Sequence, residues 1–277
     1  ISSAYSSCAG SIILRFPGSA MRIVPARNGW TWLMLGWALF RRQPLAWIML
    51  TMLLLFASVF VNLIPLAGPF VASALIPAFS LGLMVACADA EADRPPGAGA
   101  IVSGFREGGT RLLQLGGYYL IFMLLTLGIS SLADGGILMR QVLFGTMPPE
   151  TALKDGSYGA ALVLATLVAT PAFMAFWFAP ILVAWHRMGI AQALFYSFFA
   201  SLRNWRAFTV YGLAMFGGLM LLSTSVAVLG LSLGAGVQAL RGAMLGFVLV
   251  MLPAVTASFY YSYRDVFPPA DDVEPAA

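Results

Sequence analysis

Apolar residues fill this chain in long blocks that contain no ionisable side chain. None of Asp, Glu, Lys, Arg or His occurs in five intervals, 43–88, 112–133, 156–185, 207–240 and 242–263. These blocks lack the polar alternation of a half-buried strand and the polar stripe of a soluble helix. A helix needs about 20 apolar residues to cross a bilayer. The blocks therefore predict membrane-spanning helices, whose backbone polar groups are bonded within their own segment.

The first block is long enough for two spans, because it holds 46 residues. Its middle reads "NLIPLAGP", and the Pro and Gly residues there are typical of a turn. Six spans in three hairpins are therefore predicted, at about 45–64, 69–88, 112–132, 159–184, 207–229 and 243–263. We expect an all-α integral membrane protein whose transmembrane domain covers residues 21–266.

The second span of each predicted hairpin carries a Pro-Ala pair, Pro77-Ala78, Pro171-Ala172 and Pro253-Ala254. Pro-Ala also occurs outside the spans, at Pro25, Pro269 and Pro275, so the dipeptide alone is weak evidence. Each of the three hairpins shows the same order of segments along the chain: an apolar stretch, arginine, a span, a loop, a span with Pro-Ala, and charged residues where that span ends. Its threefold recurrence favours a repeat of helical hairpins, each kinked at its proline.

Two amphipathic stretches precede the first and third hairpins. Over 30–40 and 194–206, aromatic and aliphatic residues recur at helical spacing and are followed by arginines. This composition predicts helices that lie in the membrane interface, with arginine toward the headgroups. Anionic-lipid binding is the functional interpretation, and a simple interfacial anchor is the structural one. The residues expected at the headgroups are Trp37, Arg41, Arg42, Arg106, Arg203, Trp205 and Arg206.

Composition agrees with a membrane location. The 277 residues are 60% hydrophobic and 9% charged, whereas soluble domains carry about 25% charged residues. Arginines beside apolar blocks indicate the membrane edge rather than a nucleic-acid surface. With Arg15 set aside, eleven basic residues fall on one side of the six spans and three on the other, Arg140, Lys154 and Arg241. The positive-inside rule places both termini in the cytoplasm.

The two ends of the chain have a different composition. Residues 1–20 lack the basic start and long apolar core of a secretory signal, and Met21 opens "MRIVPARNGW" as a natural start would. We expect 1–20 to be a doubtful or disordered leader. The tail 267–277 is acidic and proline-rich, which predicts disorder.

Candidate chemistry is sparse. The chain contains no P-loop, G-x-S-x-G or H-E-x-x-H motif, and His186 is its single histidine. The alternating acids Asp89, Glu91 and Asp93 could hold a divalent cation, but a solvated loop after a span is the favoured interpretation. The spans carry no ionisable residue at mid-depth, which argues against a proton relay. We expect no catalytic residues, no cofactor and no metal, and therefore no enzyme.

The segment "PARNGWTWLMLGWALFRRQPLAW" resembles the opening of an uncharacterised family of bacterial inner-membrane proteins, predicted to have six spans and without an assigned activity. The residues that carry the resemblance are Pro25, Ala26, Arg27, Gly29, Trp30, Trp32, Gly36, Trp37, Phe40, Arg41, Pro44 and Trp47. More distantly, the layout is similar to the membrane domain that precedes some bacterial glycerophosphodiester phosphodiesterases, without a catalytic domain attached. The resemblance implies a bacterial inner membrane and supplies no catalytic residues.

Two functions remain open. The first is a non-enzymatic accessory or scaffold protein that binds lipid or a larger membrane complex. The alternative is a transporter or channel for a neutral or amphipathic solute. Expected partners are membrane lipids, in particular anionic ones, and a membrane-protein complex or a second copy, with no nucleic acid. A polar cavity on the bundle axis would favour the transporter, and an apolar outer groove would favour the accessory protein.

Overall fold

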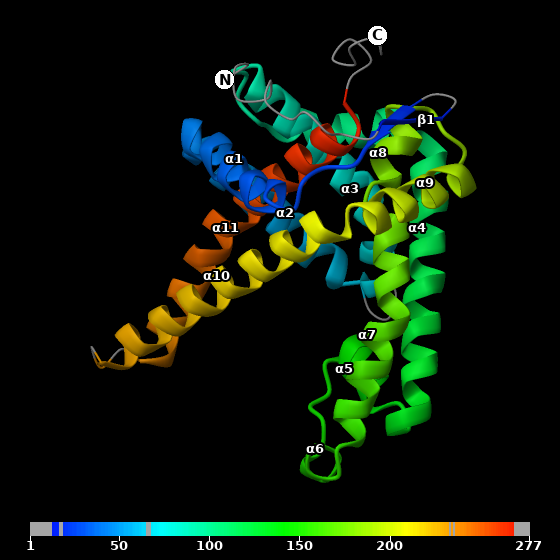
Figure 1. Ribbon diagram of the computed structural model, residues 1–277. Coiled ribbons are helices and arrows are strands. Elements are labelled where there is room, and N and C mark those ends of the chain that lie inside the picture. Colours follow the sequence, from blue (N-terminus) through cyan, green and yellow to red (C-terminus); the bar gives the residue numbers. More distant parts are fainter. Residues whose placement is uncertain (1–12, 17–18, 65–67, 233, 235, 269–277) are drawn as a thin grey trace. The chain divides into compact units, whose positions relative to one another are not determined.

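The computed structural model is built almost entirely from helices (Figure 1). It describes residues 13–16, 19–64, 68–232, 234 and 236–268. Two short strands, β1 (Ile13–Phe16) and β2 (Ser19–Arg22), pair antiparallel. The remainder of the predicted leader and residues 269–277 of the tail lie outside the described residues, so those two predictions stay predictions. The helices are α1 (Asn28–Arg42), α2 (Pro44–Asn62), α3 (Gly68–Glu91), α4 (Ala98–Asp134), α5 (Ile137–Phe144), α6 (Glu150–Lys154), α7 (Ser157–Phe176), α8 (Ala179–Ala184), α9 (Ile190–Arg203), α10 (Trp205–Ser232) and α11 (Val237–Val266).

The six predicted spans are confirmed. Within the described residues, six helical segments are long and apolar enough to cross a membrane: Pro44–Val61, Phe70–Glu91, Gly109–Asp134, Ser157–Ala184, Trp205–Gly230 and Gly242–Val266. Their ends lie within a few residues of the predicted ones, because the ionisable residues that bound the apolar blocks also mark where a span leaves the hydrocarbon.

The chain forms two compact units. The first contains Ile1–Leu55, Leu83–Ile101 and Ala200–Ala277, and the second contains Phe56–Gly82 and Val102–Phe199. In the first unit α1 packs against both α10 and α11 (Figure 1). The N-terminal and C-terminal parts of the chain are therefore joined in one unit.

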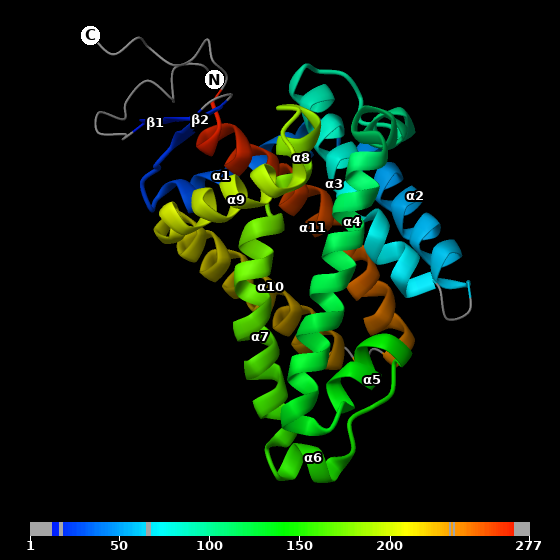
Figure 2. The ribbon, with the colours of Figure 1, turned by 90° about the vertical axis from the view of Figure 1, so that its right-hand side faces the viewer.

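The second unit contains the hairpin of α4 and α7, which run side by side (Figure 2). The connection 134–155 is not a plain loop, since it contains α5 and α6, which pack on α7. Asp134, 7% exposed, starts this connection by accepting hydrogen bonds from the backbone N–H groups of Gly136 and Leu138. At its other end the Asp155 carboxylate accepts the Ser157 N–H at 2.8 Å, and this bond lowers the pKa of the Asp155 carboxyl.

The helix α4 contains a kink that divides it into two segments. Gly109 has a left-handed φ of 48°, where a side chain would be strained, and divides α4 into a short helix over 98–108 and a span. A short helix therefore precedes every hairpin, namely α1, the start of α4, and α9. The sequence predicted such helices only before the first and third hairpins, because the second, "IVSGFREGG", is short and contains three glycines.

Each of these short helices places a small residue against the second span of a different hairpin. A β-carbon on Gly36 of α1 would lie 2.5 Å from the carbonyl oxygen of Ala254 in α11, and one on Gly104 of α4 would lie 2.7 Å from that of Ala78 in α3. The third small residue is Ser197 of α9, which contacts α7. Ala78 and Ala254 belong to the Pro-Ala pairs that suggested a repeat, so the contacts follow the repeat in cyclic order.

The contact of Ser197 with α7 coincides with a break in the helix. The buried Ser197 hydroxyl donates to the carbonyl oxygen of Met174 at 2.8 Å and accepts the N–H of Phe178 at 2.9 Å. In a continuous helix the Phe178 N–H would bond the Met174 carbonyl oxygen directly, and here the Ser197 hydroxyl lies between them. A side chain inserted into the backbone hydrogen bonds of a helix is a recognised cause of kinks. The next helix, α8, then begins at Ala179 with Pro180 in its first turn.

Candidate functional site

Helix α1 presents two apolar faces with different environments. Trp32, Gly36 and Leu39 are buried against the first unit. Three other side chains of α1 are exposed although they are large and apolar: Trp30 at 53%, Met34 at 45% and Trp37 at 37%. Exposed tryptophans at one end of a membrane domain are typical of the lipid interface. Of the predicted interfacial face, Phe40 is the exception, because it is only 5% exposed.

A buried carboxylate fixes α1 on α11. The Asp265 side chain, 5% exposed, accepts hydrogen bonds from Asn28 Nδ2 at 2.7 Å and from Trp32 Nε1 at 2.8 Å. Both donors lie in the first two turns of α1, and bonds to a charged acceptor are stronger than those between neutral groups. The orientation of α1, and with it the outward direction of Trp30 and Trp37, is therefore set by Asp265.

The C-terminal end of α1 carries the first arginine patch, formed by Trp37, Arg41 and Arg42. Both arginines are exposed. Arg42 Nη1 lies 3.7 Å from the Asp93 carboxylate, whose side chain is 85% exposed. Because a pair of this length at the surface contributes little, Arg42 stays available to a headgroup phosphate. Cations also stabilise a helix C-terminus.

The junction of α9 and α10 carries the second arginine patch, formed by Arg203, Trp205 and Arg206. All three side chains are exposed, and the Arg206 guanidinium lies over the Trp205 ring at 5.6 Å from its centroid. Asn204, 1% exposed, holds the junction by accepting the Val24 N–H at 2.8 Å and donating to the Arg22 carbonyl oxygen at 3.1 Å.

The two patches occupy opposite ends of α1 within the first unit. The start of α1 adjoins α10, because a β-carbon on Gly29 would lie 2.2 Å from the Ala207 carbonyl oxygen. Arg42 follows 13 residues later, a rise of about 20 Å along a helix. Arg106 is exposed as well but belongs to the second unit, on the short helix before Gly109. Six of the seven predicted headgroup residues thus share one unit, in two patches.

The acidic residues at the end of the second span pair with arginines. Asp89 bonds Arg94 at 2.6 Å, and Asp93 faces Arg42. Glu91 pairs with Arg264 of α11 and also accepts the Tyr260 hydroxyl at 2.8 Å. Among the described residues no three His, Cys, Asp or Glu side chains gather as a metal site would require. Of these carboxylates, Glu91 joins the end of α3 to α11, whereas the exposed pair of Asp93 and Arg42 contributes little.

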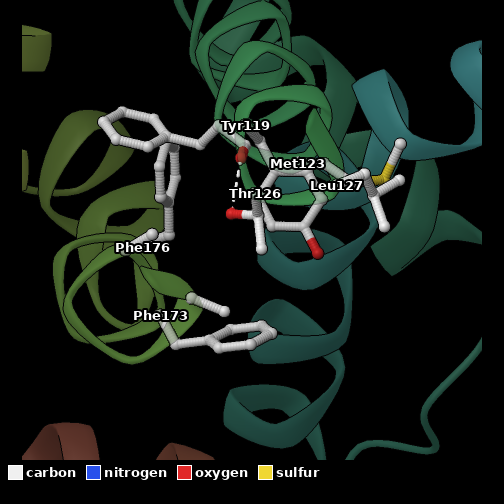
Figure 3. A pocket seen from close by; sticks show the side chains of 9 residues that line it. Tyr119, Met123, Thr126, Leu127, Phe173 and Phe176 are labelled. Carbon is white, nitrogen blue, oxygen red and sulfur yellow. Dashed lines mark hydrogen bonds between the residues drawn. The ribbon is translucent and has the colours of Figure 1, made fainter. Parts of the chain in front are cut away.

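A groove lies between α4 and α7 in the second unit (Figure 3). Its volume is ≈ 140 Å³. The rings of Tyr119 and Phe122 meet Phe176 edge-on, at centroid distances of 5.5 and 5.6 Å. Its floor, as we call the part lined by Ala169 and Ala172 of α7, receives only methyl groups from that helix. The full lining is Tyr119, Phe122, Met123, Thr126, Leu127, Ala169, Ala172, Phe173 and Phe176.

A known protein resembles this chain over most of its length. The chain is 38% identical over 252 residues to the Probable inner membrane protein BTH_II0599 of Burkholderia thailandensis, a match that covers 88% of this chain and 92% of the relative. The chain belongs to this family of inner membrane proteins. The predicted inner-membrane location is thereby confirmed. No family model and no solved structure matches, so the resemblance to the membrane domain of glycerophosphodiester phosphodiesterases stays a prediction.

The sequence did not identify several residues that organise these sites. Asp265 was seen only as part of a charged exit, and Ser197 only as one position in an aromatic stretch. A polar residue among apolar ones near a span end was the available signal, since buried polar groups need partners. The residues that line the groove gave no such signal in the sequence, because they are mostly apolar residues of the kind that fill any spanning helix.

Proposed function

We propose that the protein is a non-enzymatic accessory or scaffold protein of the inner membrane that binds anionic lipid headgroups through its two arginine patches. The carrying observation is that exposed arginines and exposed tryptophans occur together near both ends of α1, most directly at the junction of α9 and α10, where Arg206 lies over Trp205. Arginine binds phosphate with its planar guanidinium, and tryptophan prefers the headgroup level.

The charge distribution supports this proposal. All six patch residues belong to the side of the membrane that carries eleven of the fourteen counted basic residues. The positive-inside rule makes that side cytoplasmic, where the leaflet is negatively charged. A basic residue near such a surface contributes about 1 kcal/mol to binding, so four arginines would select anionic lipid clearly over zwitterionic lipid.

Native mass spectrometry of the full chain in mixed phosphatidylglycerol and phosphatidylethanolamine nanodiscs tests the proposal. We expect retained phosphatidylglycerol to exceed its share of the bilayer. Replacing Arg203 and Arg206 by Gln should lower that enrichment by about fivefold for each arginine removed, and higher salt should lower it further. Arg41→Gln with Arg42→Gln should act in the same way at the first arginine patch.

The matched control is Arg140→Gln, because Arg140 is exposed but lies on the opposite predicted side of the membrane. It should leave the enrichment unchanged. Equal lipid retention by all of these variants would overturn the proposal. A stoichiometric protein partner retained from the native membrane would identify the complex that the scaffold serves.

The alternative, a transporter or channel for a neutral or amphipathic solute, is favoured by one observation. A proline lies inside the second span of each hairpin, at Pro77, Pro171 and Pro253, and α7 is broken beyond its proline. Broken spans form solute sites in many transporters. Solute uptake by proteoliposomes that depends on Pro171, with no lipid preference, would support this alternative.

A further inference from the structure

The groove between α4 and α7 lies at the middle of both spans. The span of α4 runs over Gly109–Asp134. With a rise of 1.5 Å per residue, Tyr119 lies about 15 Å and Leu127 about 27 Å from its start, on either side of the midpoint at about 19 Å. Because the hydrocarbon core of a bilayer is about 30 Å thick, the groove faces the ends of the lipid chains and lies far from the headgroups.

The lining suits hydrocarbon. Its polar side chains are Tyr119 and Thr126, and the Thr126 hydroxyl is occupied, since it donates to the Phe122 carbonyl oxygen at 2.8 Å. Phe173, 56% exposed, stands at the margin, and the two alanines leave the floor unfilled. An apolar cavity of about 150 Å³ stays dry and accepts a body the size of benzene. A groove of ≈ 140 Å³ therefore has room for a few chain carbons, and not for a headgroup or a fused ring system.

We propose that this groove holds the terminal segment of an acyl chain of a membrane phospholipid. It is a second lipid site, built from other elements than the arginine patches and recognising the other end of a lipid. The aromatic rings of Tyr119, Phe122 and Phe176 form one wall, and burying the chain carbons contributes about 0.8 kcal/mol for each methylene. This site does not depend on the arginine patches.

Photolabelling tests this site in the full chain. The protein is placed in phosphatidylethanolamine nanodiscs whose lipid carries a diazirine at the end of one chain, and labelled residues are mapped by mass spectrometry. We expect at least fivefold more label on the groove residues than on exposed residues of α10, such as Leu213, Phe216 and Leu221. A lipid with the diazirine next to its ester should label the groove much less. A zwitterionic lipid is used so that loss of anionic-headgroup binding leaves this result unaffected.

Two variants give the experiment its controls. Ala172→Phe fills the floor and should reduce groove labelling to the level of α10, while Leu167→Phe, at a position on α7 that is 67% exposed and outside the lining, should leave it unchanged. If Ala172→Phe does not elute as a single folded species, Ala169→Leu replaces it. Equal labelling of groove and α10, or groove labelling that survives Ala172→Phe, would overturn the proposal. A free isoprenoid or other neutral solute retained in place of phospholipid would overturn it too.

Discussion

At the scale of single residues, the most consequential side chain is Asp265. It is a buried carboxylate at the end of the last span, and its two donors come from α1, 237 and 233 positions earlier in the chain. A buried charge is stable only where it is hydrogen-bonded, and removing it leaves its buried donors without an acceptor. Asp265 therefore helps to determine which face of α1 packs on the protein and which is exposed.

Asp265→Ala should destabilise the first unit, because it leaves the Trp32 indole N–H and the Asn28 amide without their acceptor. Each stranded donor costs about 1–3 kcal/mol. The measurement is unfolding in detergent by temperature or SDS. Asp93→Ala is the control, since that exposed carboxylate should cost at most about 1 kcal/mol. In a double-mutant cycle, Trp32→Phe should cost less once Asp265 is already Ala, and additive losses would contradict the assigned bond.

Part of the residue level could be predicted from the sequence. The sequence predicted Trp37, Trp205 and the arginines at the membrane edge, because an apolar run that ends in arginine indicates that edge; the structure shows these side chains exposed, and their place at the headgroups stays a prediction. The partners of Asp265 could not be predicted, since no pattern in one sequence pairs the first helix with the last. The groove depends on Ala169 and Ala172 facing Tyr119 and Thr126. That register between two helices is not contained in the hydropathy of either helix.

At the scale of elements, close helix contacts depend on which glycines meet a neighbour. Gly36, Gly104 and Gly116 abut the backbone of another helix, where a β-carbon would lie 1.8–2.5 Å from the nearest backbone atom. At Gly128, Gly212 and Gly217 a β-carbon would meet no atom within 4 Å. Small residues at interfaces let helix backbones approach closely in a membrane. The sequence showed glycines throughout the spans and did not distinguish the two groups.

Gly36→Ala should therefore loosen α1 from α11. The added methyl group would lie 2.5 Å from backbone atoms of Ala254 and Ser258, and overpacking of this kind costs about 1–3 kcal/mol. Gly212→Ala should be neutral or slightly stabilising, because alanine favours a helix over glycine by up to about 1 kcal/mol. Thermal unfolding of both variants in the same detergent measures the difference. Similar losses for the two substitutions would contradict the contact.

At the scale of the whole molecule, the six spans were predictable because charge is nearly confined to their ends. Part of the repeat was visible as well, since the Pro-Ala pairs and the charged exits recur in order, while the short helix before the second hairpin was not predicted. The cyclic contacts were not, because they join each short helix to a hairpin that does not follow it in sequence. The orientation of the chain in the membrane remains a prediction from arginine counts.

Cysteine labelling decides the orientation. In a Cys8→Ser, Cys87→Ser background, Met147→Cys should react with a membrane-impermeant maleimide in whole cells with a permeabilised outer membrane, because Met147 is 89% exposed in the connection predicted to face the periplasm. Gly97→Cys, in the connection between the first two hairpins, should react only after the inner membrane is opened. The reverse pattern would invert the predicted topology.

The bonds between α1 and α11 also bear on how the protein is made. A ribosome adds about 5–20 residues per second, so the 237 positions between Asn28 and Asp265 take roughly 10–50 s to synthesise. Throughout that interval α1 lacks the carboxylate that holds it in the folded protein. The helix α1, which is synthesised before the six spans, is thus among the last to be fixed. A message truncated before the codons for α11 would yield a nascent chain in which the side chains of α1 have no Asp265 to bond. We expect membrane quality-control proteases to degrade such a chain.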